Sequence, residues 1–154
     1  MALYIYTATD QEVEQAQREA EEGYERDVLP EEVDPRSKDR RIRDKFIGNL
    51  GELVICRVNK WKRVYPPVDG QPDAYRPDGS TAEIKTRTRW NRELIPVKPC
   101  DFAILLHHSV KQGQHLIQVV SSYDRDYLQG RGWNIFIKEK LWKAYLEDKL
   151  IRNL

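Results

Sequence analysis

The sequence has few of the residues that define several common classes of protein. Only two cysteines occur in 154 residues, Cys56 and Cys100, too few for a disulfide framework or a cysteine-based zinc site. No apolar run approaches the ~20 residues needed to span a membrane, and residues 1–10 lack the basic start and apolar stretch of a secretory signal. We therefore expect a cytoplasmic protein that does not interact with membranes, with both thiols serving as small core residues.

What remains is the composition of one soluble globular domain. Hydrophobic residues make up 40% of the chain and charged residues 33%, which predicts an ordinary core and a very polar surface. The net charge of +1 is unevenly distributed, because residues 10–34 hold eleven acidic residues against two arginines. That segment carries −9 and the rest +10, which favours a polyanionic partner and a solvated helix face equally. We divide the chain into an acidic helical segment, 1–36, and a main part, 37–154, of a single globular domain.

Two helices are expected in the first sixty residues. Thr9 to Glu12 form a capping box that predicts a helix over residues 10–27. We expect this helix to cover an apolar flank; the alternative is that its acidic side chains compete with nucleic acid for the basic surface. A second helix is predicted over residues 38–59. Its apolar stripe at helical spacing consists of Ile42, Phe46, Leu50, Leu53, Val54 and Trp61.

The second half of the chain predicts a hairpin and further strands. Arg76-Pro77-Asp78-Gly79 has the residues of a three-residue hairpin loop, with strands at about 73–76 and 80–88. Residues 101–107 are almost continuously apolar, as expected of a strand buried on both faces. The order of elements predicts an α/β or α+β fold with a small mixed sheet. The remaining elements are strands over residues 115–121 and 135–137 and an amphipathic C-terminal helix with Leu141, Trp142, Tyr145, Leu146 and Leu150.

The predicted hairpin brings candidate catalytic side chains together. With this loop, Asp73 lies opposite Glu83, and directly opposed residues of an antiparallel pair point to the same side. Lys85 shares that face because side chains alternate along a strand. Neighbouring carboxylates repel each other unless a cation lies between them, and hard cations such as Mg²⁺ prefer carboxylate oxygens. The alternative is an exposed strand face with an ordinary Glu-Lys pair.

Glu52 is the third candidate acid. On the predicted helix it lies roughly opposite Leu50, beside Gly48 and Cys56. Gly48 and Gly51 each cost about 1 kcal/mol relative to alanine inside a helix, and such glycines often mark the close approach of another backbone. We therefore expect the sheet or a substrate to approach there, with Glu52 pointing toward it. An exposed helix glutamate is the alternative.

Together these residues resemble the three motifs of the PD-(D/E)XK nuclease superfamily. The motifs are Gly51-Glu52 on a helix, Pro72-Asp73 at the start of a strand and Glu83-Ile84-Lys85 on the next strand. The resemblance covers about residues 45–120, and this segment is similar to small phage and bacterial members. If the chain is viral, we expect it to act in the host cytoplasm. It implies a restriction-endonuclease-like core, in which helices flank a central mixed β-sheet.

The resemblance also implies a chemistry. Asp73 and Glu83 would be metal ligands, joined by the Ile84 carbonyl and by Glu52 as a further ligand or water contact, while Lys85 would orient the attacking water. The cofactor would be Mg²⁺, with Mn²⁺ as a substitute, and the reaction would be hydrolysis of DNA phosphodiester bonds. No glutamine-tyrosine motif of the exonuclease branch follows Lys85, which favours an endonuclease. An RNA-directed nuclease, a nucleic-acid-binding module without catalysis, and a homodimer remain open.

Other side chains are weighed for lesser roles. The histidines His107, His108 and His115 are expected to be structural or exposed, in preference to metal ligands. Trp90 and its neighbouring arginines can stack on bases or contact phosphates, a core or edge tryptophan being equally expected. The predicted nucleic-acid contacts are Arg87, Arg89, Trp90, Arg92, Arg41 and Lys45.

Overall fold

A six-stranded mixed sheet organises the protein. The computed structural model describes residues 5–27, 34–89 and 93–137. The strand order is β1-β7-β6-β4-β3-β2, in which β4 and β6 run parallel and the other neighbours run antiparallel. The mixed α+β class predicted from the sequence is therefore confirmed. The strands of this sheet are β1 (Ile5–Thr7), β2 (Lys62–Arg63), β3 (Ala74–Tyr75), β4 (Thr81–Arg87), β6 (Phe102–Lys111) and β7 (Gln114–Asp124).

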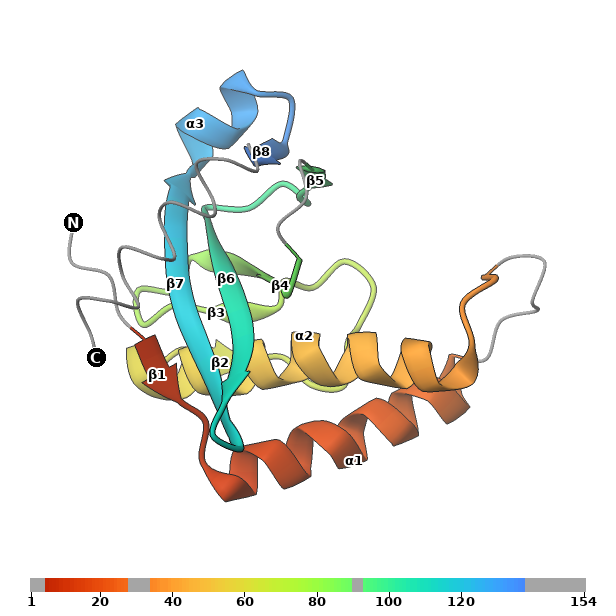
Figure 1. Ribbon diagram of the computed structural model, residues 1–154. Coiled ribbons are helices and arrows are strands. Elements are labelled where there is room, and N and C mark those ends of the chain that lie inside the picture. Colours follow the sequence, from red (N-terminus) through yellow and green to blue (C-terminus); the bar gives the residue numbers. More distant parts are fainter. Residues whose placement is uncertain (1–4, 28–33, 90–92, 138–154) are drawn as a thin grey trace.

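Two long helices lie together on one side of this sheet (Figure 1). In the capping box of α1 (Asp10–Arg26), Thr9 Oγ1 accepts from the Glu12 N–H at 3.1 Å and Glu12 Oε1 accepts from the Thr9 N–H at 2.9 Å. The second helix, α2 (Lys38–Asn59), packs against the sheet, and α1 packs against α2. Both predicted helices are confirmed. None of the helices in the described ranges is long and apolar enough to cross a membrane.

The core has two parts, one on each face of the sheet, because β6 alternates between them. Ile104 and Leu106 pack with the α2 side chains on one face, whereas Ala103 and Leu105 face the other. The second face is covered by α3 (Arg125–Gly130) and by a two-stranded ribbon of β5 (Glu93–Pro96) and β8 (Asn134–Ile137). Both faces of β6 are thus buried, as predicted.

The hairpin has the predicted register, which fixes the level of the candidate carboxylates. Ala74 pairs with Ala82 and Tyr75 pairs with Thr81. The loop is closed by the Arg76 N–H donating to the Ser80 carbonyl at 2.8 Å, and Gly79 has the left-handed φ of 85° that the turn needs. β3 is only two residues long, shorter than predicted, but its pairing with β4 has the predicted register. Asp73 directly precedes β3.

Four elements of the fold were not predicted. They are short: β1, β2 and β5 have three, two and four residues, and α3 has six. β1 is stabilised by pairing with β7, and β5 by pairing with β8. Such elements have too few residues to show a periodicity, so their sequences alone do not indicate them. The predicted strand over residues 135–137 is confirmed within β8, and the predicted C-terminal helix lies outside the described residues.

Gly51 allows α2 to touch β4. A Cβ atom on Gly51 would lie 2.0 Å from Thr86 Oγ1 and 3.1 Å from Thr86 Cβ. The predicted close approach at this glycine is therefore confirmed, although the neighbour is a side chain of the sheet. At Gly48 the prediction is wrong, because nothing lies within 4 Å of a Cβ placed there.

Gly51→Ala is expected to lower the free energy of unfolding by about 2–3 kcal/mol, because α2 and β4 must move apart to admit the methyl group. Gly48→Ala is the matched control and is expected to stabilise the helix by up to about 1 kcal/mol. Adding Thr86→Ala to Gly51→Ala removes the nearest atom and should recover part of the loss. Denaturant titration measures all three, and equal stability of the two glycine variants would contradict this packing.

Candidate active site

Asp73 lies between the other two candidate carboxylates. It immediately precedes β3, and its Oδ2 accepts a hydrogen bond from the Ile84 N–H at 2.8 Å. Its carboxyl group is also hydrogen-bonded to that of Glu83, and its negative charge raises the pKa of Glu52. The hairpin and α2 therefore bring all three predicted acids into one electrostatic cluster centred on Asp73.

Glu83 is buried on β4, with 2% of its surface exposed. Burial is the main reason that the pKa of its carboxyl lies above its ordinary value, followed by the hydrogen bond and the charge of Asp73. The positive charges of Lys98 and Lys85 oppose this shift. Two carboxyl groups in such contact can share a proton, but when both are ionised they need a neighbouring cation.

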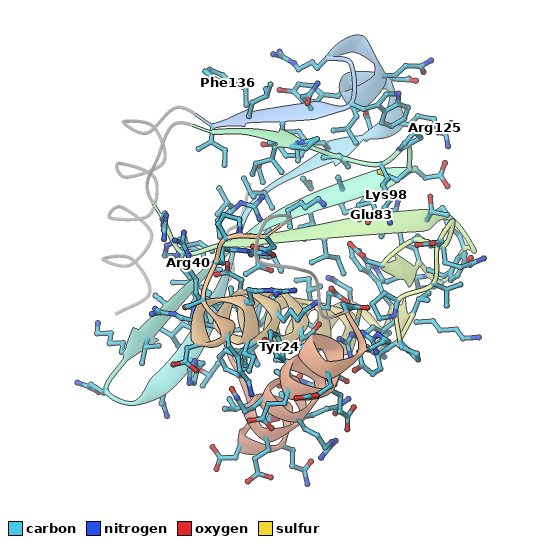
Figure 2. All side chains as sticks on the ribbon, turned by 90° about the vertical axis from the view of Figure 1, so that its right-hand side faces the viewer. Tyr24, Arg40, Glu83, Lys98, Arg125 and Phe136 are labelled. Atoms are coloured by element: carbon cyan, nitrogen blue, oxygen red, sulfur yellow. The ribbon has the colours of Figure 1, made fainter. Side chains whose placement is uncertain are left out.

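Two lysines act on this pair, and the sequence indicated only one of them. Lys85 is partly exposed and shares the Glu83 face of β4, as strand alternation predicted. Lys98 is exposed in the connection between β5 and β6 and lies on the same side as Glu83 in Figure 2. Its positive charge lowers the pKa of Glu83, as that of Lys85 does. No local pattern relates Lys98 to the hairpin, because packing of the chain brings it there.

An ion-pair network holds Glu52. Arg63 of β2 donates from Nε to Glu52 Oε1 at 3.2 Å and pairs with Glu19 of α1 at 2.7 Å. The side chains of Arg63, Glu19 and Glu52 are 10%, 4% and 19% exposed. Burial first and the charge of Asp73 second raise the pKa of Glu52 to about 7, against the lowering effect of Arg63. Arg63 and Glu19 were not among the predicted site residues, since only the folded chain brings them together.

The carboxyl oxygens of this cluster are of the type that hard cations prefer, but the three acids differ in their neighbours. Asp73 and Glu83 offer carboxylate oxygens side by side, the ligands that Mg²⁺ and Mn²⁺ prefer. Glu52 is turned toward Arg63. Within the parts of the chain that the structure describes, no three acidic, histidine or cysteine side chains converge closely enough to hold a metal ion. The Asp73–Glu83 pair therefore supplies two of the acidic groups that a metal site would need.

The cysteines and histidines have structural roles. Cys56 and Cys100 are free and buried, as predicted, and burial raises their pKa values to about 12 and about 11. His108 Nε2 and His115 Nδ1 are 2.9 Å apart, and the edge of the Phe46 ring packs against both histidines. These thiols stay protonated near neutral pH, and the two histidines serve packing.

The predicted nucleic-acid contacts differ in their surroundings. Arg41 is 6% exposed and donates to the Asp27 carbonyl at 3.2 Å, and Lys45 pairs with the Asp27 carboxylate at 3.3 Å. These two residues thus join α2 to the end of α1. Arg87 is partly buried at the end of β4, and Arg89 beyond it is exposed. Trp90 and Arg92 lie outside the described residues.

Comparison with protein-family models, with curated proteins and with solved structures found no match for this chain. A functional interpretation therefore depends on the cluster itself, its charges and its register.

Without divalent cations, Glu83→Gln is expected to stabilise the protein at about pH 8 by at least ~1 kcal/mol, since one pKa unit corresponds to about 1.4 kcal/mol. A raised pKa means that ionising the folded carboxyl costs stability, so the cost is absent below the ordinary glutamate pKa. It grows as the pH rises from there through the folded pKa. The gain should therefore vanish near pH 4. Denaturant titration in chelator measures it, with Glu14→Gln on the exposed face of α1 as control. A gain that does not depend on pH would contradict the raised pKa.

Proposed function

We propose that this protein is a metal-dependent nuclease that hydrolyses phosphodiester bonds in DNA, acting as an endonuclease on a restriction-endonuclease-like core. The observation that carries the proposal is the position of Asp73, which contacts Glu83 and the Ile84 N–H together. The buried Glu83 carboxyl beside Asp73 is costly to the fold, because its raised pKa lowers stability at neutral pH. Carboxyl groups with perturbed pKa values are typical of functional sites, and this pair is suited to bind a cation and, through it, a phosphate.

Each side chain then has a role that its surroundings support. Asp73 and Glu83 would hold Mg²⁺ or Mn²⁺, with the Ile84 carbonyl as a further ligand. When bound, the ion supplies polarisation of the phosphoryl group and a more acidic water. Lys85 lies on the Glu83 face of β4 and is suited to stabilise the attacking hydroxide or a phosphate oxygen. Glu52, with a pKa near neutrality, is suited to contact that water and to exchange a proton with it.

A second candidate function is a nucleic-acid-binding module without catalysis. The observation that favours it is the pairing of Glu52 with Arg63, by which a cation of the protein already neutralises the third acid. Under this alternative the cluster would be a remnant that binds a cation weakly. The two functions differ in whether any metal supports cleavage.

A cleavage assay with single-stranded, double-stranded and branched DNA, and with RNA, tests the proposal. Mg²⁺ or Mn²⁺ should support DNA cleavage, and Ca²⁺ should bind without efficient turnover, because catalysis needs the more compact geometry. Excess chelator should abolish the reaction. Undiminished cleavage in chelator would overturn the mechanism, whereas binding without cleavage in every metal would favour the binding module.

A further inference from the structure

A groove of about 660 Å³ lies between the first half of α2 and the end of β4. Its polar walls come from two elements that are distant in the sequence. Arg40 and Arg43 are exposed on α2, and Arg89 is exposed just beyond β4. The groove is lined by Asp39, Arg40, Arg43, Asp44, Ile47, Thr88 and Arg89.

The three arginines of the groove differ from the other basic residues of the same stretch. Arg36, Arg41 and Lys45 form ion pairs with Asp34, Asp44 or Asp27. For Arg40, Arg43 and Arg89, no ion pair is formed with any residue in the described ranges. Guanidinium groups stay charged at all physiological pH values and match phosphate oxygens in a two-pronged geometry.

The acids of the groove do not cancel this charge. Asp44 is paired with Arg36 at 2.7 Å, which leaves Asp39 as the acid facing three guanidinium groups. The lining of the groove therefore carries a surplus of positive charge on exposed side chains. A polyanion is the partner that this charge fits.

The groove and the acid cluster lie at two ends of the same pair of elements. Along α2, Arg40 precedes Glu52 by twelve residues, about 18 Å at the rise of a helix. Along β4, Glu83 precedes Thr88 by five residues, about 17 Å at the rise of a strand. The contact between Gly51 and Thr86 ties the two elements together. To the far end of the groove the two separations are similar, while Arg43 lies nine residues, about 14 Å, before Glu52. Figure 2 shows Arg40 and Glu83 apart along this stretch.

An open strand edge connects the two. β3 pairs with β4 only at Thr81 and Ala82, so β4 continues past β3 from Glu83 to Arg87. In the described sheet, no strand pairs with β4 on that side beyond Ala82. Lys85 and Arg87 are the partly exposed residues of this stretch and lie between the acid cluster and the groove.

We propose that this arginine groove binds the sugar-phosphate backbone of a duplex substrate within about five nucleotides of the scissile bond, since 17–18 Å along a duplex axis corresponds to roughly five steps of about 3.4 Å. The inference rests on the proposed function for the position of the scissile bond. The binding itself rests on the groove alone.

DNA binding by the full-length Glu83→Gln protein tests the groove, and the wild type in excess chelator gives a second measurement. A triple variant with Arg40→Gln, Arg43→Gln and Arg89→Gln should weaken binding by roughly 10- to 100-fold. The slope of log affinity against log salt should fall by about 3, one unit per phosphate contact. The control triple Arg18→Gln, Arg125→Gln and Arg131→Gln makes the same charge change at exposed positions outside the groove. It should leave the slope nearly unchanged.

A length series tests the distance. In the wild-type background, cleavage of substrates with progressively shorter arms should be compared with cleavage by the groove triple. The difference should disappear once the arm is shorter than about five nucleotides. Equal affinity and equal salt slope for the two triples would overturn the groove, as would no DNA binding by either parent protein. If cleavage fails while the slopes still differ, the proposed function is wrong and the groove stands.

Discussion

Asp73→Ala, Glu83→Ala and Lys85→Ala are each expected to lower the rate of DNA cleavage by roughly 10³-fold or more, about 4 kcal/mol of activation free energy. Asp73 contacts both Glu83 and the Ile84 N–H, so its loss removes a proposed metal ligand and a hydrogen bond to β4. Loss of Lys85 removes positive charge beside the same pair. The three effects should not add, because the residues act as one unit. Single-turnover cleavage with each variant measures them.

Folding controls separate chemistry from stability. Glu83→Gln keeps the volume of a side chain that is 2% exposed, so it should be as inactive as Glu83→Ala while remaining at least as stable as the wild type. Glu14→Ala, on the exposed face of α1, removes a carboxylate that is not part of the cluster and should leave the rate within about twofold. Near-wild-type cleavage rates in Asp73→Ala or Glu83→Ala would contradict the proposed active site.

Arg63→Met is expected to lower the free energy of unfolding by about 3–5 kcal/mol, since removing one partner of a buried network leaves uncompensated buried charge. The side chains left without their cation would be Glu19 and Glu52, which are 4% and 19% exposed. Arg57→Met is the matched control. Arg57 is 46% exposed and pairs with Glu12, so its loss should cost less than about 1 kcal/mol.

A double variant tests whether the loss of stability comes from uncompensated buried charge. Adding Glu19→Gln to Arg63→Met replaces the more deeply buried carboxylate by a neutral side chain and should recover much of the stability. Denaturant titration of the single and double variants decides the matter. A loss in Arg63→Met no larger than that in Arg57→Met would show that the network contributes little. The expected result also gives α1 a structural role, as predicted from its capping box, because Glu19 reaches the site from that helix.

The sequence was sufficient for the parts of the site that depend on local rules. The Pro77-Asp78-Gly79 loop fixes the hairpin register, and the register places Asp73 beside Glu83. Alternation along β4 then places Lys85. A capping box and an apolar stripe likewise set the bounds of the two long helices to within a residue of those observed.

The rest of the site depends on contacts between distant segments. Arg63 lies on a two-residue strand and meets Glu19 only because α1 packs against α2. Lys98 approaches Glu83 from a connection that has no regular pattern. Arg41 is a basic residue in a basic stretch, as expected of a phosphate contact, yet packing buries it against the end of α1. Sequence spacing carries no information about such tertiary contacts, which is why the predictions omitted Arg63 and Lys98 and did not foresee the burial of Arg41.

The most direct test of the central claim is calorimetric titration of Mn²⁺ into the wild type and into Glu83→Gln at about pH 8. The wild type should bind a Mn²⁺ ion and release protons on binding, because the pKa of Glu83 is raised and the metal needs the ionised carboxylate. Glu83→Gln should bind Mn²⁺ at least tenfold more weakly, about 1.4 kcal/mol. Equal binding by both proteins, or no binding by the wild type, would contradict a metal site at Asp73 and Glu83.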